Sequence, residues 1–312
     1  MGKGRPPPSS PSHDIENGIS NRMPRNERKM PPLPPPPEPW TPWLMSLVFV
    51  ADIAVFVYTM YVNDCPHSSG AERCLGYGYL GRFSFQRFKE NPLLGPSYIT
   101  LKKLGALDWK LVVEEKEYWR LVSCIWFHAG VVHLLVNMIS LLFLGIRLEQ
   151  EFGFLRIGPL YMISGLGGSL ASALSQARKK TISVGASGAL FGLLGAMLSE
   201  LFTNWSNYTN KCSALSTMVL IICLNLAVGF LPQVDNSAHI GGFVSGVLAG
   251  FVLLMRPQFG YISPKHVPKG YQIKHKVSKH LWYQYVFFSI AFVLLIIGFA
   301  VGFQRLLAGK TL

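Results

Sequence analysis

Three short segments with polar side chains interrupt the apolar stretches of this 312-residue sequence. They cover residues 128–137, 185–188 and 238–242. Ser187 lies in the second segment and His239 in the third. A serine hydroxyl becomes an effective nucleophile when a neighbouring imidazole takes its proton. The sequence therefore suggests Ser187 as a nucleophile and His239 as the base that activates it, and afterwards as the acid that protonates a leaving amine.

The first polar segment supplies hydrogen-bond donors for such a reaction. Attack on a carbonyl group creates an oxyanion, which enzymes stabilise with preorganised N–H groups. We expect the Asn137 amide and the His128 ring to take this role, together with the backbone N–H of Ser187. His133 lies one helical turn before Asn137 on the same helix face and is expected to support it.

Small residues suggest how the second and third segments meet. At helical spacing they form two stripes that lead away from the polar positions: Ser187, Gly188, Phe191, Gly192 and Gly195 in one, and His239, Gly242, Gly246 and Gly250 in the other. Such stripes are more often plain packing surfaces, but here the serine and the histidine share one end. We expect Phe191 to pack on the His239 ring, and Gly185 and Gly188 to support the serine turn. Asp235 is expected to be a loop acid rather than a third catalytic residue.

Membrane-spanning helices must position these residues. Hydrophobic residues make up 50% of the sequence and charged residues only 14%, which excludes an ordinary soluble domain. Apolar stretches long enough to cross a bilayer are expected at residues 43–62, 129–147, 157–175, 185–202, 215–231, 238–255 and 283–303. The predicted fold is therefore all-α and polytopic. A six-helix core covers residues 43–255, with a long outer loop at 63–128, and one helix follows at 283–303 before a short tail at 304–312.

The net charge of +13 is explained by membrane topology rather than by nucleic-acid binding. Residues 1–42 form a proline-rich basic tail and residues 256–282 a basic linker, and basic segments mark the cytoplasmic side. We therefore expect a cytoplasmic N-terminus, although the basic run at 178–180 opposes this orientation. The proline-rich tail is interpreted as a solvated disordered segment, with an SH3- or WW-type binding domain as the weaker alternative. The acidic residues of the tail argue against a transit peptide and favour a Golgi or plasma membrane.

The five cysteines show no CxxC pairing, so no metal site, redox site or cofactor is expected. Cys65 and Cys74 lie in the predicted outer loop, where an oxidising compartment allows a disulfide. Unpaired thiols are almost equally consistent with the sequence. The glycosylation sequons at Asn204 and Asn207 would lie on the cytoplasmic side and stay unused.

The combined motifs resemble the rhomboid family of intramembrane serine proteases. The resemblance covers residues 43–255 and depends on Trp119-Arg120, His128…His133…Asn137, Glu149…Gly153…Arg156, Gly185-Ala186-Ser187-Gly188 and Ala238-His239-Ile240-Gly241-Gly242. The proline-rich tail, the stretch Asn91–Ser97 and the extra C-terminal helix are similar to the plant rhomboid-like group. The resemblance implies a Ser–His dyad without a required acid, an oxyanion site with His128 and Asn137, and a structural role for Glu149 and Arg156. It also implies that the substrates are single-pass transmembrane proteins, cleaved near the outer membrane face.

Two other functions are compatible with parts of the sequence. A non-catalytic rhomboid-like adaptor would bind transmembrane helices in trafficking or quality control. A channel or transporter would use the intramembrane polar residues as a permeation path, but these residues gather in one half of the membrane and none is a deeply placed acid. We therefore expect a protease first and an adaptor second.

Overall fold

The computed structural model describes residues 39–176, 181–205, 210–228, 235–256 and 280–310. Four features predicted above fall wholly or largely outside these residues. They are the tail through residue 38, the linker at 257–279, the basic run at 178–180 and the second sequon. Their predicted roles, and the domain boundaries that depend on them, stay predictions.

Helices make up the regular structure of the described residues. The long helical segments are α1 (Trp43–Asn63), the continuous rod of α7 (Val131–Ser140), η4 (Leu141–Gly145) and α8 (Ile146–Phe152), then α9 (Phe154–Gln176), α10 (Ser187–Thr203), α11 (Lys211–Val228), α12 (Asn236–Leu253) and α13 (Trp282–Leu307). Within the rod, η4 is a π-helical turn. Short helices fill the segment between α1 and α7: α2 (Cys65–Ser69), η1 (Ala71–Arg73), α3 (Tyr77–Leu80), η2 (Gly81–Phe83), α4 (Tyr98–Leu104), α5 (Trp109–Val113), α6 (Arg120–Ser123) and η3 (Cys124–Trp126). The predicted all-α polytopic class is confirmed.

Each predicted span coincides with one of the long segments. Five of them are long and apolar enough to cross a membrane: Trp43–Ser69, Val131–Phe152, Phe154–Ser175, Asn236–Leu253 and Trp282–Leu307. Apolar segments in α10 and α11 are shorter, at Ser187–Thr203 and Lys211–Cys223. The count of seven crossings therefore stays a prediction.

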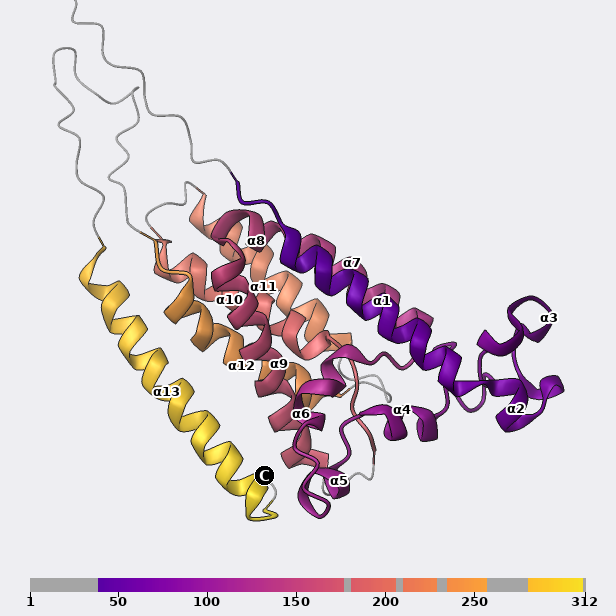
Figure 1. Ribbon diagram of the computed structural model, residues 1–312. Coiled ribbons are helices and arrows are strands. Elements are labelled where there is room, and N and C mark those ends of the chain that lie inside the picture. The colour runs from indigo at the N-terminus through magenta and orange to yellow at the C-terminus, as the bar shows by residue number, and fades with distance from the viewer. Residues whose placement is uncertain (1–38, 177–180, 206–209, 229–234, 257–279, 311–312) are drawn as a thin grey trace, which may run out of the picture. The chain divides into compact units, whose positions relative to one another are not determined.

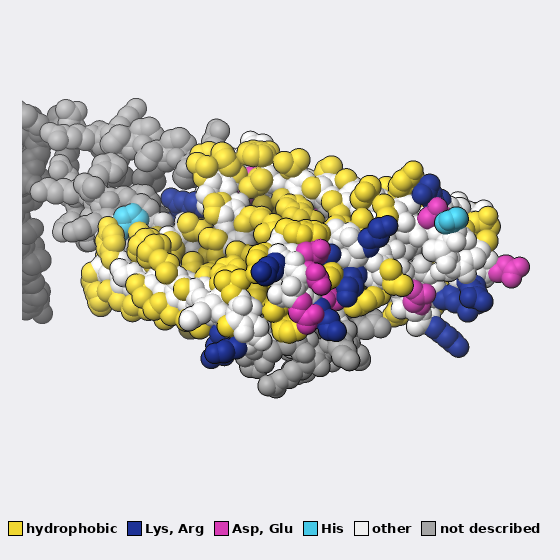
Figure 2. All heavy atoms as spheres, turned by 60° about the horizontal axis from the view of Figure 1, so that its bottom comes forward, with side chains coloured by type: hydrophobic (Ala, Val, Ile, Leu, Met, Phe, Trp, Pro, Cys, Tyr) yellow, Lys and Arg dark blue, Asp and Glu magenta, His cyan; other side chains and the backbone are white. Residues whose placement is uncertain are grey.

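Helices α9, α10 and α12 form the centre of the bundle, with α1 and α13 along opposite sides (Figure 1). The central helices approach each other closely because glycines, which have no side chain, lie where α10 and α12 touch. A Cβ on Gly242 of α12 would lie 2.0 Å from the carbonyl oxygen of Gly188 on α10, and one on Gly246 would lie 2.1 Å from that of Gly192. The predicted packing of two glycine stripes is thus confirmed. Hydrophobic side chains cover much of the outer surface in Figure 2, as lipid contact requires.

The first turn of α1 is capped by an acidic residue from the C-terminal end of the α7–η4–α8 rod. Glu149 of α8 is fully buried, and its carboxylate accepts hydrogen bonds from the backbone N–H groups of Leu44 (2.9 Å) and Met45 (2.7 Å). These N–H groups lie in the first turn of α1 and have no helical partner of their own. Glu149 is therefore a structural cap and does not line the cavity that contains Ser187, in agreement with the structural role that the resemblance implied.

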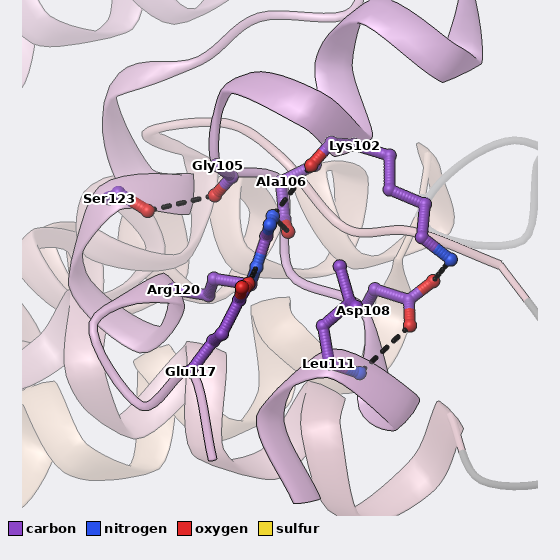
Figure 3. A network of polar contacts seen from close by, with 8 residues as sticks. All are labelled: Lys102, Gly105, Ala106, Asp108, Leu111, Glu117, Arg120 and Ser123. Atoms are coloured by element: carbon purple, nitrogen blue, oxygen red, sulfur yellow. Dashed lines mark hydrogen bonds and ion pairs between the residues drawn. The ribbon is translucent and has the colours of Figure 1, made fainter. Parts of the chain in front are cut away.

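A disulfide and a polar network organise the loop between α1 and α7. Cys65 and Cys74 are bonded, with their Cα atoms 6.0 Å apart, so the disulfide alternative holds. Arg120 pairs with Glu117 and donates to the carbonyl groups of Lys102 (2.7 Å) and Ala106 (2.9 Å) (Figure 3). Arg120 thus ties the turn after α4 to α6.

Candidate active site

Ser187 is the first residue of α10, and the segment before it is held on both sides. Ser183 forms two backbone hydrogen bonds of 3.0 Å with Leu107, and the N–H of Gly185 donates to the carbonyl of Cys124 at 2.9 Å. The backbone N–H of Ser187 lies in the first turn of the helix, where amide groups have no intrahelical acceptor. The hydroxyl and this N–H are therefore both presented at the end of α10.

Ser187 and His239 meet at the end of the two glycine stripes. The distance between Ser187 Oγ and His239 Nε2 is 2.9 Å, which is a hydrogen bond. His239 lies in the first turn of α12, and its side chain is buried. The predicted juxtaposition of serine and histidine is therefore present in the structure.

Two neighbours surround the His239 ring in different ways. Phe191, one turn beyond Ser187, stacks on it with ring centroids 4.1 Å apart and an interplanar angle of 12°. The carboxylate of Asp235 is used elsewhere: it accepts from the N–H of Ala238 at 3.2 Å and from the hydroxyl of Ser172. His239 Nδ1 has no hydrogen-bond partner within the described parts of the chain. Asp235 is thus the N-cap of α12 and not the third member of a triad.

His133 and Asn137 face the serine from α7. A Cβ on Gly185 would lie 2.7 Å from His133 Cε1 and 3.8 Å from Asn137 Nδ2, so these two side chains adjoin the turn that carries Ser187. Gly185 has a φ of +125°, which L side chains rarely adopt. Glycine is therefore required at 185 both for its backbone conformation and for the space that His133 occupies.

The expected place of His128 needs a correction. Its side chain is fully buried, and it is absent from the residues that line the cavity at Ser187. Its ring packs edge-on against that of His133, with centroids 5.4 Å apart. Burial lowers the pKa of His128 to about 3, so the ring is neutral. The described structure therefore places His133 and Asn137, and not His128, in the cavity lining with Ser187.

A cavity of about 760 Å³ opens onto these side chains. Its lining includes Ser187, Phe191 and His239 from α10 and α12, and His133, Val136 and Asn137 from α7. The loop between α1 and α7 adds Glu90, Asn91, Pro92, Leu93 and Pro96. No cluster of metal-ligating side chains occurs among the described residues. The cavity can therefore bring a polypeptide segment to a serine, a base and several N–H donors at once.

Sequence reasoning missed two features of this cavity. The first is the choice of histidine: the i, i+4 spacing predicts that His133 and Asn137 share a helix face, but it does not tell whether His128 or His133 lines the cavity with Ser187. The second is the contribution of Asn91–Pro96, which had no signal in the sequence, since its contact with Ala129 joins residues 38 positions apart and depends on how the loop between α1 and α7 folds.

Comparison with known proteins agrees with this arrangement. The family model described as Rhomboid domain matches residues 115–256. RHOMBOID-like protein 5 of Arabidopsis thaliana is 58% identical over 309 residues, which cover 99% of this chain and 97% of that protein. RHOMBOID-like protein 1 of the same plant is 59% identical over 265 residues, 85% of this chain and 67% of that protein. Inactive RHOMBOID-like protein 8 is 44% identical over 228 residues, 73% of this chain and 64% of that protein. The chain described here belongs to the rhomboid family.

Proposed function

We propose that this protein is an intramembrane serine endopeptidase that cleaves single-pass transmembrane proteins by a Ser187–His239 dyad. The observation that carries the proposal is the 2.9 Å hydrogen bond between Ser187 Oγ and His239 Nε2, inside a cavity large enough for a peptide segment. Oxygen and nitrogen at this distance are positioned for direct proton transfer.

The proposed reaction uses the two side chains in sequence. Ser187 Oγ attacks the scissile carbonyl carbon while its proton moves to His239 Nε2. The imidazolium then gives this proton to the leaving amine, and an acyl-enzyme remains on Ser187. A water molecule repeats the process and releases the second product. His239 Nε2 must start without a proton, so Nδ1 carries the hydrogen in the resting dyad. The stacked Phe191 ring holds the imidazole in place.

The oxyanion would be stabilised by the backbone N–H of Ser187, the Asn137 amide and the His133 ring. His133 Nδ1 accepts a hydrogen bond from the N–H of Ala129 (3.4 Å), which assigns the ring hydrogen to Nε2. Nε2 lies 2.9 Å from the position of a Cβ on Gly185, so it faces the serine turn. Asn137 Nδ2 donates one hydrogen to the carbonyl of His133 (3.0 Å) and keeps its second for a ligand. His133 thus takes the role that the sequence had suggested for His128.

The substrates would enter from the membrane and be cut near its outer face. A stable transmembrane helix hides its carbonyl groups in hydrogen bonds, so helix-breaking residues near the cut would favour cleavage. The Cys65–Cys74 disulfide in the loop between α1 and α7 supports placing that loop on the oxidising side of a secretory-pathway membrane. The N-terminus would then be cytoplasmic, in a Golgi or plasma membrane. The other proposed partners are membrane lipid around the bundle and, as the alternative to a solvated tail, an SH3- or WW-type domain bound to the proline-rich tail.

A second candidate is a non-catalytic adaptor that binds transmembrane helices. It is favoured by one specific observation, the 44% identity to a relative named Inactive RHOMBOID-like protein 8. An adaptor would keep the helix-binding cavity without depending on the hydrogen bond between Ser187 and His239.

Labelling with a fluorophosphonate probe separates the two candidates. The full-length protein in liposomes should be labelled at Ser187, and Ser187→Ala and His239→Ala should each abolish both labelling and cleavage of a transmembrane reporter. Ser46→Ala and His67→Ala are matched controls, because both side chains are exposed and lie outside the cavity lining. Loss of labelling only in the first pair supports the protease. An unlabelled wild-type protein that still binds the reporter would support the adaptor instead.

A further inference from the structure

The side chain of Asn91 uses all of its hydrogen-bonding groups within the protein. Its Nδ2 donates to the carbonyl groups of Pro96 (2.8 Å) and Ala129 (2.7 Å), and its Oδ1 accepts from the N–H of Leu93 (3.0 Å). An asparagine amide has two donor hydrogens, and both are committed here. One side chain therefore closes the Asn91–Pro96 loop on itself and fastens it to the residue that precedes Gly130 and α7.

The backbone of the same loop caps α7. The N–H groups of Val131 and Val132 donate to the carbonyls of Leu94 (2.9 Å) and Leu93 (3.2 Å). These N–H groups belong to the first turn of the helix and have no helical acceptor. Gly130, the residue before the helix, offers no capping side chain. The Asn91–Pro96 loop therefore does the work of an N-cap and determines where α7 begins.

Two glycines allow the loop and the helix start to touch through their backbones. A Cβ on Gly95 would lie 2.1 Å from the carbonyl oxygen of Ala129, and one on Gly130 would lie 2.2 Å from that of Leu93. At these distances the backbone of the loop cannot shift along the start of α7 without a steric clash. On its far side, the loop is followed by Ser97, whose N–H donates to Asn63 Oδ1 at the end of α1 (2.8 Å). The loop is thus a fixed bridge between α1 and α7.

The helix that this bridge positions carries two of the proposed oxyanion donors. His133 lies in the first turn of α7 and Asn137 one turn further, and both line the cavity together with Asn91, Pro92 and Leu93. We propose that Asn91 is a positioning residue, which acts through Ala129 and the start of α7 to hold His133 and Asn137 opposite Ser187. The catalytic part of this inference depends on the proposed protease function, whereas the positioning of α7 does not.

The test compares variants of full-length protein in liposomes. Asn91→Ala removes all three side-chain hydrogen bonds, and Asn91→Asp keeps the acceptor for Leu93 but loses both donors. Ser97→Ala is the matched control, because it removes the hydroxyl that caps α4 through Thr100 and leaves α7 untouched. Two measurements are made on each: kcat and KM for a transmembrane reporter, and hydrogen–deuterium exchange of the amides at residues 129–137 and 187–195.

Both Asn91 variants should lower kcat by about ten- to a hundredfold with little change in KM, because a misplacement of about 1 Å in a catalytic group can cost about a hundredfold in rate. Exchange should rise at residues 129–137 and stay unchanged at 187–195. Ser97→Ala should change neither kcat nor exchange at 129–137. The inference is overturned if Asn91→Ala keeps the wild-type kcat, or if exchange at 129–137 does not rise. If the wild-type protein proves inactive, the protease proposal fails, and the exchange measurement alone still decides whether Asn91 positions α7.

Discussion

A methyl group added at Gly242 should separate the proposed catalytic pair while leaving the bundle assembled. The new Cβ of Gly242→Ala would lie 2.0 Å from the carbonyl oxygen, 2.7 Å from the carbonyl carbon and 3.0 Å from the Cα of Gly188. All three are backbone atoms of α10, so the clash cannot be relieved by a change of side-chain rotamer. An ordinary contact begins at 3.4 Å, and the two helices must therefore part by about 1.4 Å at this level.

This displacement reaches the active site directly. His239 lies three residues before Gly242 on the same helix, so it moves with the backbone of α12. The distance between Ser187 Oγ and His239 Nε2 would grow from 2.9 Å to about 4 Å, which is beyond a hydrogen bond. A loss of about 1 Å in alignment costs about a hundredfold in rate. The overpacking itself should lower the free energy of unfolding by about 1–3 kcal/mol.

The assay follows kcat for a transmembrane reporter, the rate of fluorophosphonate labelling and the unfolding temperature. Gly298→Ala on α13 is the matched control, because a Cβ there meets no atom within 4 Å. Gly298→Ala should keep the wild-type rates, and Gly242→Ala should label and cleave about a hundred times more slowly while still unfolding cooperatively. A Gly242→Ala protein with wild-type rates would refute the reasoning that links helix spacing to the Ser187–His239 distance.

Two further predictions concern the side chains around the site. Phe191→Ala should lower kcat by about two- to tenfold, because the stacked rings of Phe191 and His239 contribute about 0.5–1.5 kcal/mol. Phe191→Tyr keeps the ring and should keep the wild-type kcat, so equal kcat values for the two variants would contradict this prediction. His128 has a pKa of about 3 in the folded protein against an ordinary value of 6.5. Between these two pH values the unfolded chain binds a proton at His128 and the folded protein does not. The free energy of unfolding should therefore fall as pH drops below 6.5, by about 1.4 kcal/mol per pH unit from this group, and His128→Gln should lack that part of the dependence when unfolding is measured at pH 7 and pH 5. A difference between wild type and variant that does not change between these pH values would count against a buried neutral His128.

Most of the helical architecture was predictable because lipid imposes a simple rule on the chain. A segment that crosses a bilayer needs about 20 apolar residues, and this requirement can be read without knowing any contact. The predicted stretch at 43–62 matches α1, and that at 157–175 matches α9 within a few residues. The short helices between α1 and α7 were not predicted, since they depend on contacts such as those of Arg120 with the carbonyls of Lys102 and Ala106.

Some residues of the proposed site were likewise predictable from the sequence, and others were not. Ser187 and His239 were recognisable because polar side chains are costly in an apolar helix, and their glycine stripes indicated which faces would meet. The choice between the two histidines was not recognisable. His128 and His133 have the same chemistry, and only the packed structure places one ring against the serine turn and buries the other behind it.

The sequence by itself determined the polytopic all-α class, the rhomboid resemblance and the pairing of a serine with a histidine. These properties depend on local composition and on helical periodicity, and both can be read from short segments of the sequence. The tertiary structure alone decided that Asp235 caps a helix, that His133 and not His128 lines the cavity with Ser187, and that Asn91 is hydrogen-bonded to Ala129 just before α7. These properties depend on distances between residues far apart in the chain. Such distances are set only when the helices and the loop between α1 and α7 pack together.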